Sequence, residues 1–191
     1  MPISLADKRA TFRKLHDSGC FVIPNPFDVG SAKALAQMGF KALASTSAGF
    51  AWTIGKADNR VTVDDVCAHL TALCAAVDLP VNADFENGFA DDPDEVGDNV
   101  AMAIETGIAG LSIEDSTRDL QNPLYDIDVA AERIRAARHA NPLQPKAHLP
   151  VVGVHQFPQQ RSQDLGIFSA LLVLGLLTAG ASGVHARSSR S

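Results

Sequence analysis

Residues 79–115 read LPVNADFENGFADDPDEVGDNVAMAIETGIAGLSIED, and this stretch decides the fold. Residues 79–83 and 110–113 are short, mostly apolar stretches of the kind that form buried strands. Between them, Pro93 stands where the first residue of a helix is favoured, acidic residues follow it in the first turn, and Gly107 comes after the helix. A strand, a helix and a strand in this order predict two parallel strands joined by a helical crossover.

The same alternation continues toward the amino terminus. Residues 20–23 form an apolar run that predicts a strand, after which Asp28 can cap a helix that ends at Gly39. Residues 40–45 predict the next strand, and Thr62, with an acidic residue three positions later, resembles a capping box that opens another helix. Each predicted strand is thus followed by a helix.

On the carboxyl side, Asp126 can cap a further helix that runs to His139, which brings the count to four βα units. Such units build either an open doubly wound sheet or a closed barrel, and periodicity does not distinguish them. The turn after the first strand, residues 24–28 (PNPFD), is neither GxGxxG nor a P-loop, which favours the barrel. We predict an α/β fold of the (β/α)8 TIM-barrel type, truncated to about four βα units.

Charge divides the 191 residues into two parts. Residues 1–140 hold 12 basic and 21 acidic residues, whereas residues 141–191 hold four basic residues, one acid, several prolines and an uncharged run at 165–184. We therefore place a boundary near Ala140, between the N-terminal half of a TIM-barrel domain and an atypical Pro-rich and apolar tail. The net charge of −6 argues against nucleic acid or an anionic membrane surface as a partner. Three cysteines without a CxxC pair, and no visible signal peptide, predict the reducing cytoplasm.

Acidic residues stand at the ends of two neighbouring predicted strands. Asp84 and Glu86 follow the third strand two positions apart, so in extended chain they would face the same side, and Glu114 ends the fourth strand. Converging carboxylates repel unless a cation lies between them, and Mg²⁺ prefers oxygen ligands, commonly one or two protein carboxylates. The pattern predicts a magnesium site, with Mn²⁺ as a substitute. The alternative is that these acids are solvated or cap the following helices.

The second predicted strand leads into residues 45–49 (STSAG), a run of small residues. Its backbone N–H groups can receive a carboxylate or phosphate, although a plain turn explains the run equally well. The following connection, residues 50–60, is long and contains Gly55, which is typical of a lid over a site and also of an ordinary long loop.

Five motifs together resemble the isocitrate lyase and phosphoenolpyruvate mutase superfamily. The resemblance covers residues 10–140, and the motifs follow the family's order and spacing: 25–28 (NPFD), 45–49 (STSAG), 55–58 (GKAD), 80–88 (PVNADFENG) and 107–115 (GIAGLSIED). The last two are the most specific, because they occur together about thirty residues apart. The resemblance implies a magnesium-dependent barrel enzyme.

The resemblance also implies roles for individual residues. Asp84 and Glu86 would be the magnesium-site acids, with Glu114 holding the metal through water. Asp58 would be the lid acid that meets the reacting group, and it is the predicted catalytic residue. The substrate would be contacted by a further set of residues, most of them small: Thr46, Ser47, Ala48 and Asn122.

The family's reactions make or break a C–C or P–C bond beside an enolpyruvate or 2-oxo acid group, which implies a small carboxylate or oxo-acid substrate. Magnesium can neutralise the oxyanion that grows in such a reaction. The lyases that act on isocitrate and methylisocitrate carry a Lys-Lys-Cys-Gly-His motif after the fourth strand, where this chain has residues 116–123 (STRDLQNP). The departure favours a mutase-like, phosphonate-cleaving or oxo-acid lyase or decarboxylase activity over a true isocitrate lyase.

Residues 141–191 depart from the family, whose barrel continues through four more βα units and a substrate-binding arginine. We interpret this tail as an out-of-frame or unrelated segment on a truncated domain, and we predict an inactive chain that forms homo-oligomers through exposed strand edges. Two alternatives stay open. Residues 165–184 are long enough to cross a bilayer as a helix, which would give a membrane-anchored binding protein, or they cover the edge of a non-catalytic barrel fragment.

Overall fold

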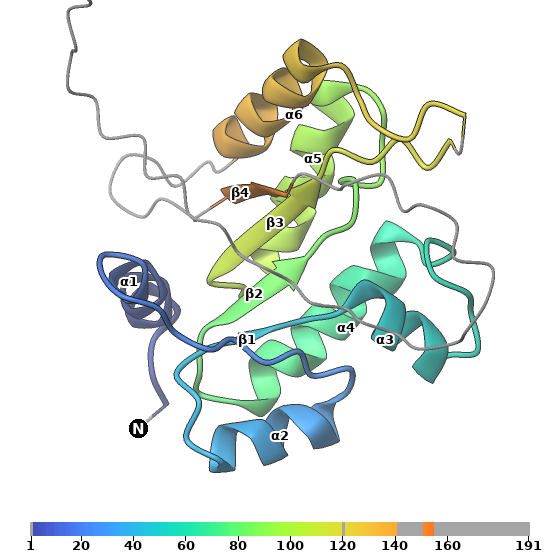
Figure 1. Cartoon of the computed structure of the whole chain (residues 1–191). Helices are drawn as coiled ribbons and strands as arrows, with labels where there is room; N and C mark the ends of the chain where they lie inside the picture. Colours follow the sequence, from blue (N-terminus) through green and yellow to red (C-terminus); the bar gives the residue numbers. More distant parts are fainter. Residues whose placement is uncertain (1, 120, 141–150, 155–191) are drawn as a thin grey trace, which may run out of the picture. The chain divides into compact units, whose positions relative to one another are not determined.

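The computed structural model of the chain describes residues 2–119, 121–140 and 151–154 (Figure 1). Four strands form one parallel sheet: β1 (Leu43–Ala44), β2 (Val81–Asp84), β3 (Gly110–Glu114) and β4 (Val151–Val154). The helices of the described part are six in number: α1 (Leu5–Leu15), α2 (Val29–Gln37), α3 (Ser47–Thr53), α4 (Val63–Ala76), α5 (Pro93–Glu105) and α6 (Ile127–His139). Helices separate successive strands from β1 to β4, which is the alternation that the sequence predicts.

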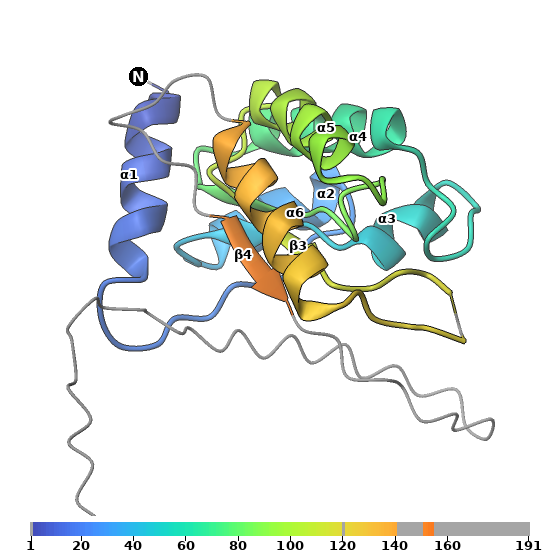
Figure 2. The same ribbon diagram turned by 90° about the horizontal axis from the view of Figure 1, so that it is seen from above.

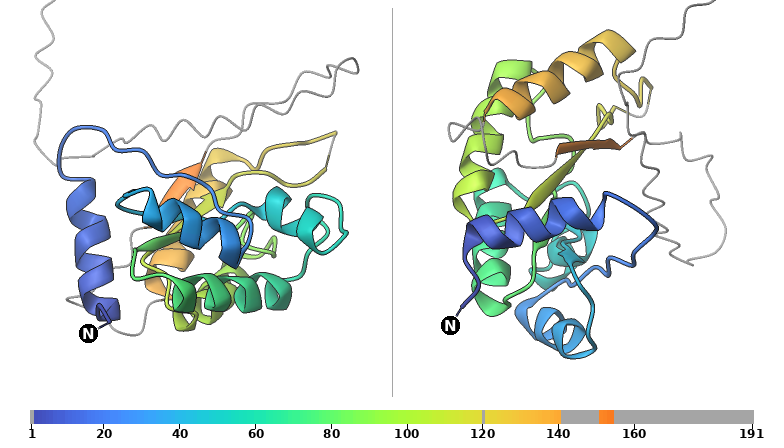
Figure 3. Two further views of the ribbon diagram at one scale, coloured as in Figure 1. Left: turned by 90° about the horizontal axis from the view of Figure 1, so that it is seen from below. Right: turned by 90° about the vertical axis from the view of Figure 1, so that its left-hand side faces the viewer.

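The strands lie in the sheet in the order in which they occur in the chain, β1-β2-β3-β4. A doubly wound sheet reverses direction at a switch point, whereas a barrel adds every new strand on the same side of the previous one. The order therefore matches one segment of a (β/α)8 barrel wall. The helices agree, because α5 packs against both α4 and α6 (Figure 2) and α2 packs beside α4 (Figure 3).

Helix starts follow the capping residues found in the sequence. The Thr62 hydroxyl accepts a hydrogen bond from the Asp65 N–H while the Asp65 carboxylate accepts one from the Thr62 N–H, which confirms the capping box at α4. Asp28 caps α2 in the same manner with Ser31. At α5, Pro93 is the first helical residue, as predicted. These caps satisfy backbone N–H groups that a helix otherwise leaves unpaired.

One predicted strand is absent from the structure, and one strand of the structure was not predicted. Residues 20–23 form no strand: Phe21 and Ile23 pack against a cluster that includes Phe12 of α1, and the segment contacts the sheet next to this run, where the Ala44 N–H of β1 donates to the Pro24 carbonyl at 3.0 Å. The fourth strand is instead β4, which pairs with β3 in parallel register and lies past the predicted boundary near Ala140. The sheet therefore continues beyond the change in composition, and the domain boundary stays a prediction.

The connection after β1 is shorter than predicted. The small-residue run at 45–49 leads directly into α3, whose N-cap is Thr46, so the helix takes up the first part of the expected loop at 50–60. Asp126 precedes α6, as expected, but its side chain makes no capping hydrogen bond.

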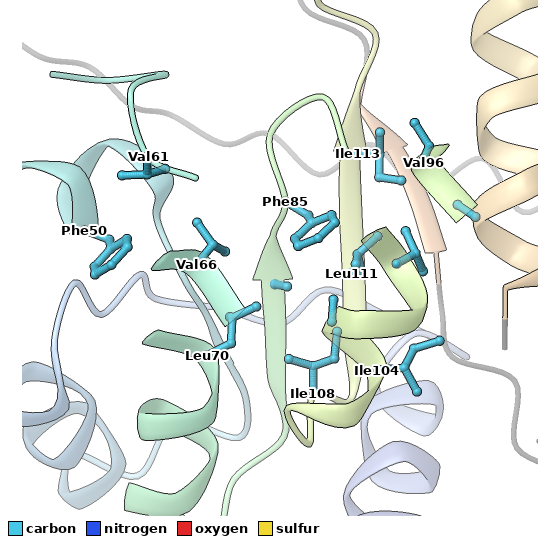
Figure 4. Packing of buried hydrophobic residues seen from close by; sticks show 14 of the residues in the cluster. Phe50, Val61, Val66, Leu70, Phe85, Val96, Ile104, Ile108, Leu111 and Ile113 are labelled. Atoms are coloured by element: carbon cyan, nitrogen blue, oxygen red, sulfur yellow. The ribbon is translucent and has the colours of Figure 1, made fainter. Parts of the chain in front are cut away.

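The sheet has two chemically different faces. On the face covered by helices, the strands contribute the buried apolar side chains Ala83, Leu111 and Ile113. They belong to one cluster with Val66 and Leu70 of α4 and Ile104 of α5 (Figure 4). The alternate positions of β2 and β3, which face the other way, are small or polar: Asn82, Asp84, Gly110, Ser112 and Glu114. On that face the Asn82 amide donates to Ser112 Oγ at 3.4 Å, across the two strands.

Helix α1 closes the amino-terminal end of this polar face. A Cβ built on Gly110 would lie 2.3 Å from Phe12 Cε1, so glycine is required at this position. The buried Arg9 guanidinium donates to the Ile108 carbonyl at 3.0 Å and to the Ile104 carbonyl at 3.2 Å. The first helix of the chain is thus tied to the segment that precedes β3.

No helix within the described ranges is long and apolar enough to cross a membrane. The uncharged run at 165–184, with most of the predicted tail, lies outside the described residues. The membrane-anchor alternative therefore stays a prediction, as does the cytoplasmic location.

Candidate active site

The carboxyl ends of β1, β2 and β3 meet at one edge of the sheet, as parallel pairing requires. This edge carries Ser45 after β1, Asp84 at the end of β2 and Glu114 at the end of β3. The strand positions behind them, Asn82 and Ser112, are buried and polar. The predicted strand-end residues therefore lie where (β/α)8 folds place their chemistry.

Asp84 is held by the segment that follows β1. The Ser47 backbone N–H and hydroxyl both donate to Asp84 Oδ2, at 2.8 and 2.9 Å, and the Asp84 N–H donates to Ser45 Oγ at 2.9 Å. The small-residue run thus binds a carboxylate, but this carboxylate belongs to the chain itself. Burial raises the pKa of Asp84, the hydrogen bonds from Ser47 oppose the shift, and the charge of Asp58 adds to it.

Glu86 completes a carboxylate pair with Asp84, but it lies in the turn after β2. The strand ends at Asp84 and Glu86 has a φ of 44°, so strand alternation does not set the direction of its side chain. That side chain is 2% exposed, and its Oε2 forms an ion pair with Arg118. The other oxygen, Oε1, is buried and has no hydrogen-bond partner among the described residues. Burial raises the pKa of Glu86 to about 7, while Arg118 acts to lower it and Asp84 to raise it.

Three further predicted site residues differ in how they lie relative to the carboxylate pair. Asp58 is exposed in the connection between α3 and α4, yet its charge contributes to the raised pKa of both members of the carboxylate pair, so it lies within electrostatic reach of them. The Glu114 N–H donates to the Glu86 carbonyl at 2.7 Å, which joins the end of β3 to the turn after β2. Asn122 is exposed, and its side chain donates within its own loop at 3.5 Å.

Thr46 and Ala48 flank Ser47 at the start of α3. Thr46 Oγ1 caps the helix by accepting from the Gly49 N–H at 3.3 Å, and Ala48 is partly buried in the first turn. A Cβ on Gly49 would lie 2.6 Å from Thr46 Cγ2 and 3.1 Å from Phe27 Cβ, so the helix start is closely packed. These contacts fix the three residues predicted to bind substrate beside the carboxylate pair.

The turn that carries Glu86 is anchored by a buried arginine of α6. Arg133 is 1% exposed. Its guanidinium donates to three backbone carbonyls of the turn: Asn87, Ala90 and Asp91. The same guanidinium lies 4.0 Å from the centroid of the Tyr125 ring. A helix that packs beside the sheet thus fixes the backbone on which Glu86 stands.

The sequence reasoning missed both arginines of the site. A signal for Arg133 was available, because it stands one turn before the buried Ala137 and so shares the inward face of α6. Arg118 belongs to residues 116–123, a departure from the lyase motif in which only Asn122 was predicted to take part in the site. It is the sole lysine or arginine between positions 61 and 132, which marks it as a counter-ion for the acids nearby.

No three His, Cys, Asp or Glu residues lie close enough to form a metal-binding group within the part of the chain that the structure describes. Glu114 is therefore not gathered with the carboxylate pair into one cluster, and Ser47 and Arg118 each bind an oxygen of that pair. The donor chemistry still fits Mg²⁺, which commonly takes one or two protein carboxylates and keeps several waters. The buried Glu86 Oε1 offers one such oxygen.

Comparison with known proteins supplies the family. The family model described as phosphoenolpyruvate phosphomutase matches residues 12–152. An uncharacterized protein of Mycobacterium tuberculosis (strain H37Rv) is 36% identical over 133 residues, which make up 69% of this chain and 49% of that protein. The chain thus spans about half the length of the curated relatives it matches.

Solved structures share the fold. A putative lyase/mutase from Burkholderia cenocepacia J2315 is 42% identical, with a TM-score of 0.75 over 80% of this chain and 55% of its own. Phosphonopyruvate hydrolase in complex with oxalate and Mg²⁺ is 19% identical, with a TM-score of 0.69 over 80% of this chain and 53% of its own, a likeness of fold alone. Because the family model covers well over half of the residues, the chain belongs to the phosphoenolpyruvate phosphomutase family, which confirms the superfamily that its motifs resemble.

Proposed function

We propose that this chain carries the magnesium-binding part of a lyase or mutase that makes or breaks a C–C or P–C bond beside an enolpyruvate or 2-oxo acid group. The observation that carries the proposal is the carboxylate pair at the carboxyl edge of the sheet. Ser47 is bound to Asp84, and one buried oxygen of Glu86 has no partner among the described residues. Burial opposes the ionisation of both acids, and groups perturbed in this way concentrate at functional sites.

In this proposal the carboxylate pair holds Mg²⁺ or Mn²⁺, with Glu114 as a ligand through water. The metal, when bound, would stabilise an oxyanion on the substrate as a Lewis acid. Phosphonopyruvate hydrolase is solved with oxalate and Mg²⁺, and we extend that ligand class, a small carboxylate or 2-oxo acid, to this chain.

The residues around the pair would position the substrate and exclude water. Thr46, Ser47 and Ala48, fixed at the start of α3, would receive the substrate carboxylate. Asp58, whose charge acts on the pair from the connection after α3, would approach the reacting group when this connection closes. Asn122 would contact the closed connection from the loop after β3.

A second candidate is a protein that binds this ligand without turnover. The observation that favours it is that contacts within the chain already engage both members of the carboxylate pair, through Ser47 and Arg118. Since the chain spans about half the length of its curated relatives, the activity of a whole family member is a proposal for it. Binding and turnover therefore need separate measurements.

Thermal melts test the metal site. A ligand that binds only the folded chain at ten times its dissociation constant stabilises it by about 1.4 kcal/mol, a rise in Tm of roughly 3–6 °C. Asp84→Asn should abolish the rise. Asp17→Asn, the same change at an exposed position outside the site, should keep it. A wild-type melting curve that Mg²⁺ or Mn²⁺ does not move would reject the site.

Two assays separate the candidates once metal binding is established. Calorimetry with oxalate in the presence of Mg²⁺ measures ligand binding, which both candidates expect. A coupled assay with phosphonopyruvate and 2-oxo dicarboxylates as substrates measures turnover; pyruvate is detected directly, and phosphoenolpyruvate is detected after pyruvate kinase and ADP are added. Metal-dependent formation of either product supports the enzyme, whereas oxalate binding without either product supports the second candidate.

A further inference from the structure

We propose that Arg118 and a divalent cation compete for Glu86, so that the guanidinium is the resident counter-ion of the site and leaves the carboxylate when metal binds. The inference rests on the proposed function, because it assumes that the carboxylate pair accepts a metal. Charge distribution along the chain supports it, since Arg118 is the one lysine or arginine between positions 61 and 132, against 17 acidic residues in the same stretch.

Arg118 reaches the site from the loop after β3. Its Nη2 forms an ion pair with Glu86 Oε2, and its guanidinium lies 5.4 Å from the centroid of the Phe89 ring. The Glu86 side chain is 2% exposed, whereas that of Arg118 is 31% exposed. The carboxylate and the ring therefore hold the guanidinium in place. Of the two ion-pair partners, only the Arg118 side chain is accessible to solvent.

The backbone around this contact is unusual. Three of the four non-glycine residues with positive φ in the described ranges take part in it: Glu86 (44°), Phe89 (60°) and Arg118 (63°). A positive φ is unfavourable for residues with a Cβ, and it persists where surrounding contacts hold it in place. The ion pair and the ring contact supply such contacts, so the turn after β2 and the loop after β3 hold each other in this arrangement.

Electrostatics explains why the two cations should exclude each other. Asp84 and Asp58 both act on Glu86, so the buried carboxylate lies in a region of negative charge that needs a cation. Arg118 supplies one in the absence of metal. A divalent ion on Glu86 Oε1 would place two further positive charges beside the guanidinium, in surroundings with little water, where like charges repel strongly. The exposed partner, Arg118, is the one that can move away.

Calorimetric titration with MgCl₂ at constant ionic strength tests the competition. Arg118→Gln should bind Mg²⁺ about tenfold more tightly than the wild type, the factor expected when a charge-assisted hydrogen bond need not be broken. Arg118→Lys keeps the charge but lacks the planar guanidinium, so its Mg²⁺ affinity should lie between those of the wild type and Arg118→Gln. Arg135→Gln removes the same charge from an exposed position of α6, and its affinity should stay within about twofold of the wild type.

The wild-type protein offers a second readout. The Nη–H resonances of Arg118 in nitrogen–proton NMR report its ion pair directly, because Nη2 is the atom that contacts Glu86. They should move toward the position of solvated arginines when Mg²⁺ is added, and they should not do so with NaCl of equal ionic strength. This measurement decides the matter even if Arg118→Gln does not fold.

Two results overturn the inference, and they differ in what they leave standing. Mg²⁺ affinity that is unchanged or weaker in Arg118→Gln, or an Arg118 resonance unmoved at saturating Mg²⁺, removes the competition and leaves the metal site intact. Absence of Mg²⁺ binding in the wild type and in all three variants removes both the competition and the proposed function.

Discussion

His69 in α4 should make the fold less stable as the pH is lowered from 7.5 to 5. Its ring stacks on Phe50 of α3, with centroids 4.0 Å apart and planes inclined by 13°. Its Nε2 is buried and has no hydrogen-bond partner among the described residues. Burial lowers the pKa of His69 from 6.5 to about 4, and the charge of Asp28 opposes this shift. Protonation in the folded chain would therefore place a charge on a buried ring nitrogen that has no hydrogen-bond partner among the described residues.

Proton linkage fixes the direction and size of the effect. Between pH 4 and 6.5 the unfolded chain binds a proton that the folded chain does not, so stability that is present above pH 6.5 is lost as the pH falls toward 4. With these two pKa values, the free energy of unfolding at pH 5 is about 2 kcal/mol lower than at pH 7.5. Because the ring is partly accessible to water, we expect roughly 1 kcal/mol, or a fall in Tm of about 2–4 °C.

Urea unfolding at pH 7.5 and pH 5 measures this difference in wild type and His69→Phe. The Phe ring keeps the stack and the core volume but cannot be protonated, so its free energy of unfolding should lose roughly 1 kcal/mol less over the same pH change. His139→Gln, an exposed position in the last turn of α6, is the matched control and should behave as the wild type. Contributions from carboxyl groups are common to all three proteins and cancel. Equal pH dependence in wild type and His69→Phe would refute the reasoning.

Three further predictions concern packing, the turn after β2 and a surface pair. Gly110→Ala should destabilise the fold by about 1–3 kcal/mol because the added methyl overlaps Phe12. In thermal melts, the double variant with Phe12→Leu should regain part of this stability. Losses of stability that simply add in the double variant would contradict the overlap. Arg133→Lys should lower both Tm and Mg²⁺ affinity, since one ammonium cannot donate hydrogen bonds to the three carbonyls of the turn as the guanidinium does. A lower Tm with unchanged Mg²⁺ affinity would limit Arg133 to a stabilising role. Lys56→Ala should raise the pKa of Asp65 from about 2 in a carboxyl NMR titration, because the hydrogen bond from the Lys56 ammonium, 2.5 Å away, is the largest cause of the lowered pKa. A pKa that stays near 2 would assign the shift to the helix cap.

Local signals in the sequence predicted local structure well. The capping box at Thr62 and the helix start at Pro93 are confirmed, because cap chemistry depends on residues within three positions of each other. The strand at 20–23 was wrong, because an apolar run does not reveal whether it joins a sheet or packs on a helix. Phe21 and Ile23 do the second.

The candidate site was predictable only in part. Asp84 lies at a strand end, and parallel strands bring such ends together, so its place followed from the βα pattern. The pairing of Arg118 with Glu86 spans 32 positions between two loops and depends on left-handed backbone at both residues. No periodicity in the sequence records such a contact.

The docking of α1 has a consequence for the order in which the chain folds during synthesis. The Arg9 guanidinium binds carbonyls that lie 95 and 99 residues further along the chain. Contacts this distant in sequence carry a large loop-closure entropy and form late in folding. Helix α1 therefore cannot dock until the segment before β3 has emerged from the ribosome, and until then its Phe12 side chain is open to a chaperone.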